Sequence, residues 1–128
     1  MNAVSVFAVG FGAFAGAIVR WLLGLVLNPL LPHIPLGTLA ANLVGGLIMG
    51  VAMGLFAHFD SVPLAWRLAV TTGFLGGLTT FSSFSAETTS LVLRAQWGWT
   101  AAIIGAHVVG SIAMTLAGFG LVRLFLRG

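Results

Sequence analysis

The fold is decided by the stretch Gly76-Gly77-Leu78-Thr79-Thr80-Phe81-Ser82-Ser83-Phe84-Ser85. It lies within residues 66–93, an apolar segment long enough to cross a lipid bilayer. Its two adjacent glycines weaken a helix, and hydroxyl and aromatic side chains follow them. Because every backbone polar group inside hydrocarbon needs a partner, a break there is tolerated only where protein buries it or where it lines a cavity. We therefore predict a membrane helix broken near residues 76–82, at a place where something polar binds or passes.

The composition of the chain indicates an integral membrane protein. Of its 128 residues, 59% are hydrophobic and 5% are charged, whereas a soluble domain carries about 25% charged residues. So few charges cannot cover a surface that faces water. The five basic residues are all arginines and are scattered along the sequence, so they form no basic stripe for nucleic acid. The absence of cysteine excludes a disulfide framework and a thiolate metal site.

Four segments are apolar and long enough to cross a bilayer, at about residues 3–27, 36–57, 66–93 and 98–125. Short connectors that contain prolines or polar residues separate them. Tryptophans lie near the ends of the segments, where an aromatic belt meets the membrane surface. We predict a single all-α transmembrane domain over residues 1–128, with four transmembrane helices of which the third is broken mid-membrane.

The arginines give almost no preference for one orientation in the membrane. If both termini face the inside, Arg67, Arg123 and Arg127 lie inside, against Arg94 and Arg20 outside. Such a weak bias leaves two interpretations open. The chain has one orientation that other factors hold, or it inserts both ways and allows an antiparallel homodimer. Four helices are few for a solitary pore, which favours the homodimer.

Small and polar residues recur at helical spacing in the predicted spans. Glycine pairs or triplets four residues apart predict close helix packing, at Gly12 and Gly16, at Gly46, Gly50 and Gly54, and at Gly73 and Gly77. An amide inside a bilayer is costly unless it is hydrogen-bonded, so Asn42 either ties helices together or faces a polar pathway. In the last span, His107, Ser111 and Thr115 share one helix face and form a polar track.

Two charged side chains lie inside predicted spans. Arg20, near the end of the first span, either reaches the membrane interface or pairs with a partner inside. We favour the interface, where it would attract anions to a vestibule. Glu87 follows the broken stretch and is expected to find hydrogen bonds among its neighbours Thr88, Thr89 and Ser90. A lone membrane carboxylate is also a means of coupling transport to protons, but the first span has no matching acid.

The broken stretch favours a small anion as the bound species. Phe81 and Phe84 are three residues apart and share a face if the helix resumes there. The edge of an aromatic ring is positive, so ring edges together with hydroxyl donors suit an anion that has lost its hydration. A full positive charge would hold the anion too tightly for conduction. The break also frees backbone carbonyls between Gly76 and Thr79, and carbonyls coordinate hard cations such as Na+. Two antiparallel copies could bring two sets of these carbonyls together and form a structural cation site.

At this point the chain resembles the Fluc (CrcB) fluoride channels over nearly its whole length. The resemblance rests on Arg20-Trp21, on Gly37-Thr38-Leu39-Ala40-Ala41-Asn42-Leu43, on the long motif from Thr72 to Glu87, and on Gly110-Ser111. It implies an antiparallel, dual-topology homodimer with two separate fluoride pores. It also implies a central structural Na+ held by the backbone carbonyls of Gly76 and Thr79 from both subunits.

The resemblance further implies the residues of the fluoride path. Phe81 and Phe84 match the phenylalanines whose ring edges line it, and Asn42 matches the pore asparagine. Thr80, Ser82 and Ser111 match hydroxyls near the path. His107 falls where members of the family differ, so the resemblance assigns it no role.

The implied activity is passive export of cytoplasmic fluoride across the cell inner membrane. Fluoride enters as neutral HF, dissociates and accumulates, and a selective pore lets the membrane potential drive it out. Two other interpretations remain, a small proton-coupled multidrug antiporter of dual topology and a non-transporting helical subunit. An enzyme is not expected, because no spacing forms a catalytic relay of serine, His107 and Glu87.

Overall fold

The computed structural model describes residues 1–127, and every secondary-structure element in that range is helical. Three long helices are continuous: α1 (Ala3–Leu27), α2 (Leu36–His58) and α6 (Trp97–Leu126). The shorter elements are η1 (Asn28–Leu30), α3 (Leu64–Leu68), η2 (Ala69–Leu75), α4 (Gly76–Leu78) and α5 (Phe81–Leu93). The prediction of an all-α chain is confirmed, and the three long helices are each long and apolar enough to cross a membrane.

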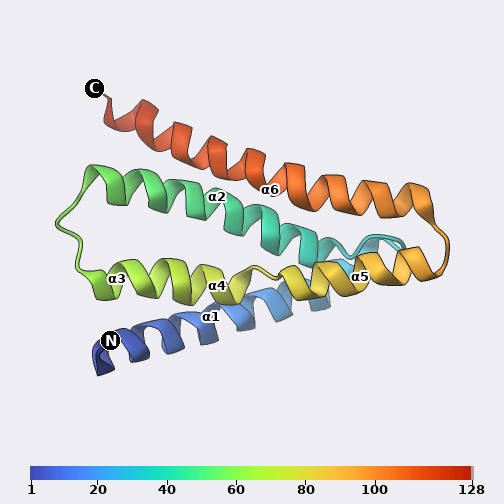
Figure 1. Cartoon of the computed structure of the whole chain (residues 1–128), viewed down its shortest axis with the longest axis horizontal. Coiled ribbons are helices and arrows are strands. Elements are labelled where there is room, and N and C mark those ends of the chain that lie inside the picture. Colours follow the sequence, from blue (N-terminus) through green and yellow to red (C-terminus); the bar gives the residue numbers. More distant parts are fainter. Residues whose placement is uncertain (128) are drawn as a thin grey trace.

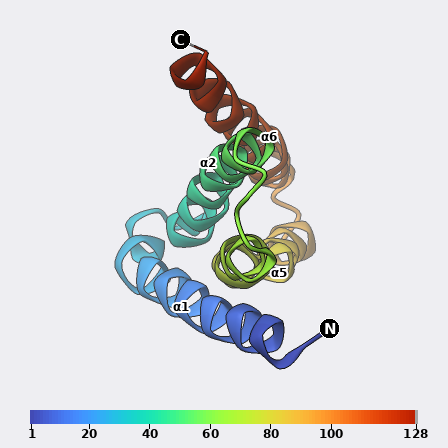
Figure 2. The same ribbon diagram turned by 90° about the vertical axis from the view of Figure 1, so that its left-hand side faces the viewer.

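The helices form two packed groups (Figure 1). Helices α2 and α6 lie side by side, and α1 packs against the run from α3 to α4. The groups approach each other at the end that carries α5 and diverge toward the end that carries both termini. Figure 2 shows the same divergence from that end, with α1 and the C-terminal part of α6 far apart. The space between α2, α6 and the α3–α5 run is where the candidate site lies.

Glycines allow the close packing within each group. A Cβ atom at Gly50 of α2 would overlap with the backbone carbonyl of Thr115, and one at Gly118 of α6 would overlap with that of Leu47. In the other group, a Cβ at Gly16 of α1 would overlap with the carbonyl of Phe74. The predicted glycine packing is therefore confirmed, because the backbones touch where these side chains are missing.

An asparagine side chain joins the first two long helices. The Oδ1 atom of Asn28, just after α1, accepts a hydrogen bond of 2.7 Å from the N–H of Gly37 in the first turn of α2. This satisfies one of the amide groups that the start of a helix leaves without an intrahelical partner. The three prolines of the connector explain why neither helix extends through it.

The helical run between Leu64 and Leu93 is interrupted at two residues, Thr79 and Thr80. Their backbones are extended, with φ −83° and ψ 156° at Thr79 and φ −151° and ψ 117° at Thr80. The expected break near residues 76–82 is thus shorter, and the glycines at its start are helical, with φ −63° and ψ −36° at Gly76. Gly77 instead packs against the backbone of Ala13 in α1.

The seven residues before α4 form a π-helix, which no sequence pattern predicts. This element, η2, runs from Ala69 to Leu75 and packs against α1. A π-helical turn is wider than an α-helical turn, is rare, and often occurs at functional sites. The expected third span is therefore a series of short helical pieces with different pitches, and neither the piece before the break nor α5 is as long as α1, α2 or α6.

Candidate functional site

Asn42 binds the backbone of the break from the opposite helix. Its Oδ1 atom accepts a hydrogen bond of 2.8 Å from the N–H of Thr80, and its Nδ2 atom donates one of 3.1 Å to the carbonyl of Thr80. Thr80 is extended, so neither group can bond within a helix. One side chain of α2 thus satisfies both backbone groups of a residue in the break, which accounts for an amide at this position.

His107 of α6 completes this hydrogen-bonded cluster. Its Nδ1 atom lies 2.9 Å from Nδ2 of Asn42. Because the N–H of Thr80 must point at an oxygen, the amide of Asn42 has one orientation, and its Nδ2 atom is the donor to His107. Nδ1 therefore accepts, and the neutral ring carries its proton on Nε2. Nε2 is buried and has no hydrogen-bond partner within residues 1–127.

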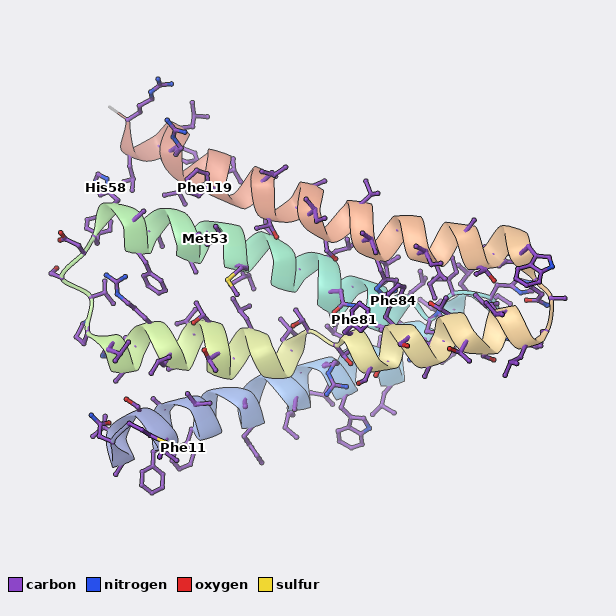
Figure 3. All side chains as sticks on the ribbon, in the orientation of Figure 1. Phe11, Met53, His58, Phe81, Phe84 and Phe119 are labelled. Carbon is purple, nitrogen blue, oxygen red and sulfur yellow. The ribbon has the colours of Figure 1, made fainter. Side chains whose placement is uncertain are left out.

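The imidazole of His107 is the first of three neighbouring aromatic rings. The imidazole stacks on Phe84, with centroids 4.6 Å apart and an interplanar angle of 28°. Phe84 in turn meets Phe81 edge to face, at 5.4 Å and 76°. Phe84 is buried, with 7% of its surface exposed, whereas Phe81 is 77% exposed. Figure 3 shows the two phenylalanines next to each other at the start of α5.

These groups line a cavity of about 460 Å³ between α2, α6 and the broken run. Seven of the residues expected at the fluoride path or the Na+ site lie on its wall: Asn42, Gly76, Thr79, Thr80, Phe81, Phe84 and Ser111. His107 and Thr115 line it as well, so the polar face expected on the last span borders one cavity. Because exposed Phe81 is part of the wall, the cavity opens at the surface of the chain.

Ser82 and Arg20 do not line this cavity. The hydroxyl of Ser82 is exposed and lies 3.3 Å from that of Thr80, so it meets the cavity only through its neighbour. The Nε atom of Arg20 donates a hydrogen bond of 3.1 Å to the carbonyl of Gly77. Arg20 is half-buried and lines a separate cavity of about 300 Å³. This bond ties the guanidinium to the backbone next to the break, and the interfacial position expected for Arg20 stays a prediction.

Glu87 also lines that second cavity, together with Thr38. The hydroxyl of Thr38 donates a hydrogen bond of 2.7 Å to Oε2 of Glu87, and Oε1 is buried without a partner within residues 1–127. The expectation that Glu87 bonds its sequence neighbours is wrong. Thr88, for example, donates to the carbonyl of Phe84 instead. The physical reason is that Glu87 points from α5 toward α2, away from its own helix.

The backbone at the break leaves several carbonyls without their helical donors, among them those of Gly76 and Thr79. In a continuous helix the N–H of Thr80 would donate to Gly76, and that of Ser83 to Thr79. Here the N–H of Thr80 donates to Asn42, and that of Ser83 donates to Oγ1 of Thr80 at 3.1 Å. The carbonyls of Gly76 and Thr79 are therefore available to another partner, and both residues line the larger cavity. Carbonyl oxygens are suitable ligands for a hard cation.

Comparison with known proteins shows which family the chain belongs to. The model of the family described as CrcB-like protein, Camphor Resistance (CrcB), matches residues 7–119, which include every residue that lines the two cavities. The chain belongs to the CrcB-like family. Its membership confirms the resemblance from the sequence motifs, and the CrcB-like proteins are a family of channels rather than enzymes.

Curated CrcB-like relatives align over almost the whole chain. The protein named Fluoride-specific ion channel FluC from Tolumonas auensis is 53% identical over 123 residues, which are 96% of this chain and 97% of that protein. A protein of the same name from Nitrosospira multiformis is 52% identical over 96% of each chain. Another from Chromobacterium violaceum is 55% identical over 89% of this chain and 90% of its own.

Two features of this CrcB-like chain could not be assigned from its sequence. The sequence assigned no role to His107, although its spacing of four residues from Ser111 indicated that both lie on the same helix face. The bond between Thr38 and Glu87 joins residues 49 positions apart. The only sequence signal for it was that Thr38 lies one helical turn before Asn42 and shares its face.

Proposed function

We propose that the chain is a fluoride-selective ion channel that exports cytoplasmic fluoride passively and so reduces its toxicity. The observation that carries the proposal is the identity of about half of its residues with proteins named fluoride-specific ion channels, over nearly the full length of both chains. The rival interpretations, a proton-coupled multidrug antiporter and a non-transporting subunit, have no comparable support.

The larger cavity has the chemistry that a small anion needs on leaving water. Hydroxyls of Thr80 and Ser111, the free Nε2–H of His107 and the edges of Phe81 and Phe84 are weak donors spread along one wall. Among residues 1–127, no charged side chain lines this cavity. Binding of an anion is then loose enough to allow it to leave, as conduction requires. Ser82 and Arg20 act near the ends of the path, and Arg20 draws anions to a vestibule.

In the proposed topology, the chain crosses the cell inner membrane four times. Helices α1, α2 and α6 each cross once, and the interrupted run from Leu64 to Leu93 is the third transmembrane helix, broken mid-membrane. The hydrogen bonds from Asn42 and Arg20 to the backbone around the break support this, because exposed amide and carbonyl groups are costly in hydrocarbon.

The working form is an antiparallel, dual-topology homodimer with two pores. Two observations support it. The arginines are nearly balanced between the two sides, which allows insertion both ways. The larger cavity also opens at a surface where Phe81 is exposed in the single chain. A second copy that covers this surface would convert an open groove into an enclosed path.

A structural Na+ that is not transported binds between the two copies. Its ligands are the backbone carbonyls of Gly76 and Thr79 from each subunit, which have lost their helical donors. The ion would supply positive charge to hold four carbonyl dipoles together at the centre of the dimer. Its contribution is structural, because it fixes the break in each subunit relative to the other.

Fluoride efflux from liposomes tests the proposed function. The purified protein is reconstituted with internal K+ fluoride, and valinomycin and a K+ gradient drive the anion out while a fluoride electrode records its release. A parallel run uses chloride. We expect rapid fluoride release and negligible chloride release. A correctly folded protein that releases no fluoride would overturn the proposal, and release of both ions at similar rates would remove its selectivity.

A further inference from the structure

A third cavity lies far from the break, at the end of the molecule that carries both termini. It measures about 290 Å³ and lies between the last turns of α2 and α6. None of the residues on its wall lines either cavity of the proposed fluoride site. Figure 3 shows two of them, His58 and Phe119, at this end of the two helices.

Its wall combines positive charge with an apolar surface. The side chains of Arg123, Arg127 and His58 lie on the wall with Phe119, Val122 and Leu126. The guanidinium carbon of Arg123 lies 5.9 Å from the centroid of the Phe119 ring, which holds the charge above the apolar part. A ligand that matches both parts has a charged head and a hydrocarbon tail.

The two arginines differ from the other three in the chain, because their guanidinium groups have no hydrogen-bond partner within residues 1–127. Within residues 1–127, neither Arg123 nor Arg127 forms a hydrogen bond or a salt bridge. By contrast, Arg67 donates to the carbonyls of Val62 and Phe59, at 3.0 and 3.2 Å. The negative end of α6 favours arginines nearby. That effect does not explain a cavity between them and α2, nor their lack of bonds to the helix carbonyls.

The position of the cavity selects a membrane ligand. Helices α2 and α6 are both long and apolar enough to cross a bilayer, so their ends lie at its surface. Arginine binds phosphate through paired N–H donors, and basic pockets between transmembrane helices at the membrane surface suit anionic headgroups. We propose that this cavity binds the phosphate headgroup of an anionic phospholipid, with an acyl chain along Phe119 and Val122. The proposal rests on the membrane topology given above, not on fluoride conduction.

Native mass spectrometry of the full-length protein tests this inference. The protein is released from detergent in the presence of phosphatidylglycerol or of phosphatidylcholine with the same acyl chains, and the retained lipid is counted. We expect phosphatidylglycerol to be retained in preference. The double variant Arg123→Gln, Arg127→Gln should weaken its binding by about tenfold to thirtyfold, since each arginine near the surface contributes about 1 kcal/mol to binding an anionic lipid.

A matched control separates the cavity from general surface charge. Arg94 lies near the opposite end of the bundle and is exposed, and it lines none of the three cavities. Arg94→Gln should leave lipid retention unchanged. Equal loss in this variant, or unchanged retention in the double variant, would overturn the proposal. Displacement of the lipid by millimolar inorganic phosphate would overturn it too, because the site would then bind soluble anions.

The result of this experiment can be interpreted even if the chain proves not to be a fluoride channel. Lipid retention is a mass measurement and needs no ion flux. Gel filtration of the double variant shows whether it still folds, and a variant that elutes as the parent does but retains less phosphatidylglycerol supports the site. If the double variant fails to elute correctly, Phe119→Ala removes the aromatic ring from the wall and leaves both arginines in place, and unchanged retention in that variant would also contradict the proposal.

Discussion

At the scale of single residues, Asn42 supplies hydrogen bonds that the break between α4 and α5 removes. It accepts from the N–H of Thr80, donates to its carbonyl and donates to His107. The sequence left two roles open for this amide, tying helices together or facing a polar pathway. In the structure it bonds two other elements and also lies on the cavity wall. Its role in the path itself stays a prediction.

Replacement of Asn42 by leucine tests this network. Leucine has a similar size but leaves both backbone groups of Thr80 without their partner, and each unsatisfied buried group costs about 1–3 kcal/mol. We expect loss of fluoride efflux and a clear fall in the temperature at which the protein stops eluting as a folded peak. Asn2→Leu is the control, since Asn2 caps α1 at an exposed position and should affect stability by about 1 kcal/mol. Full efflux from Asn42→Leu would contradict the assignment.

Phe81 and Phe84 offer a pair with opposite surroundings. The variants Phe81→Ile and Phe84→Ile should each lose most of the fluoride efflux, because isoleucine lacks the positive ring edge. Only Phe84→Ile should also destabilise the chain, by about 0.5–1.5 kcal/mol beyond the change in buried area, since Phe84 stacks on His107 and Phe81 is exposed. Thermal unfolding and efflux are measured on the same preparations.

An exposed phenylalanine of α1 gives the control for this pair. Phe14 is 69% exposed and lies on no wall of the larger cavity. Phe14→Ile should leave efflux and dimer assembly as they are. Normal efflux from both Phe81→Ile and Phe84→Ile would exclude the rings from the mechanism, and loss of dimer in either would mean that they act through assembly.

At the scale of elements, the sequence predicts the helices well and their local geometry less well. The expected segments differ from the observed helical runs by no more than two residues at any end, because apolar length and proline-containing connectors are local signals. The glycines at the break were expected to interrupt the helix, yet they are helical. The interruption at Thr79 and Thr80 depends on a side chain of α2, 38 residues earlier in the chain. A local sequence pattern cannot predict a contact between residues so far apart in the chain.

The same limit explains the π-helix and the second cavity. Residues 69–75 contain nothing that distinguishes a π-helical turn from an α-helical one, and α1 packs closely against them. Likewise, the hydrogen bond of Arg20 joins residues 57 positions apart. Sequence periodicity assigns residues to a helix face, but it does not say which other helix that face meets.

Helix packing gives a test at this scale. A Cβ at Gly50 would overlap with the carbonyl of Thr115, whereas one at Gly120 would meet open space. Gly50→Ala should force α2 and α6 apart and destabilise the chain by about 1–3 kcal/mol. Gly120→Ala should be neutral or stabilise it by up to about 1 kcal/mol, because alanine favours a helix. The folded fraction after stepwise heating measures both, and equal behaviour of the two variants would contradict the packing.

At the scale of the whole molecule, one chain leaves its candidate site open. The larger cavity has walls from α2, α6 and the broken run, and exposed Phe81 stands at its mouth. Gly76 and Thr79, whose carbonyls lack their helical donors, line this same cavity. A second, antiparallel copy would cover the opening and bring its own pair of carbonyls. The dimer and its ion are therefore linked proposals, and they are best tested together.

Removal of Na+ is the test of both. If the carbonyls of Gly76 and Thr79 from two copies hold a structural Na+, replacing all Na+ with a large organic cation should shift the protein toward monomer or abolish fluoride efflux, because four carbonyl dipoles would then face one another uncompensated. Sedimentation and efflux are measured in matched Na+ and organic-cation buffers, and readdition of Na+ should restore both. Potassium in place of the organic cation separates a need for Na+ from a need for ionic strength. A Na+-free protein that stays dimeric and conducts normally would exclude the ion and leave the dimer to be explained by packing alone.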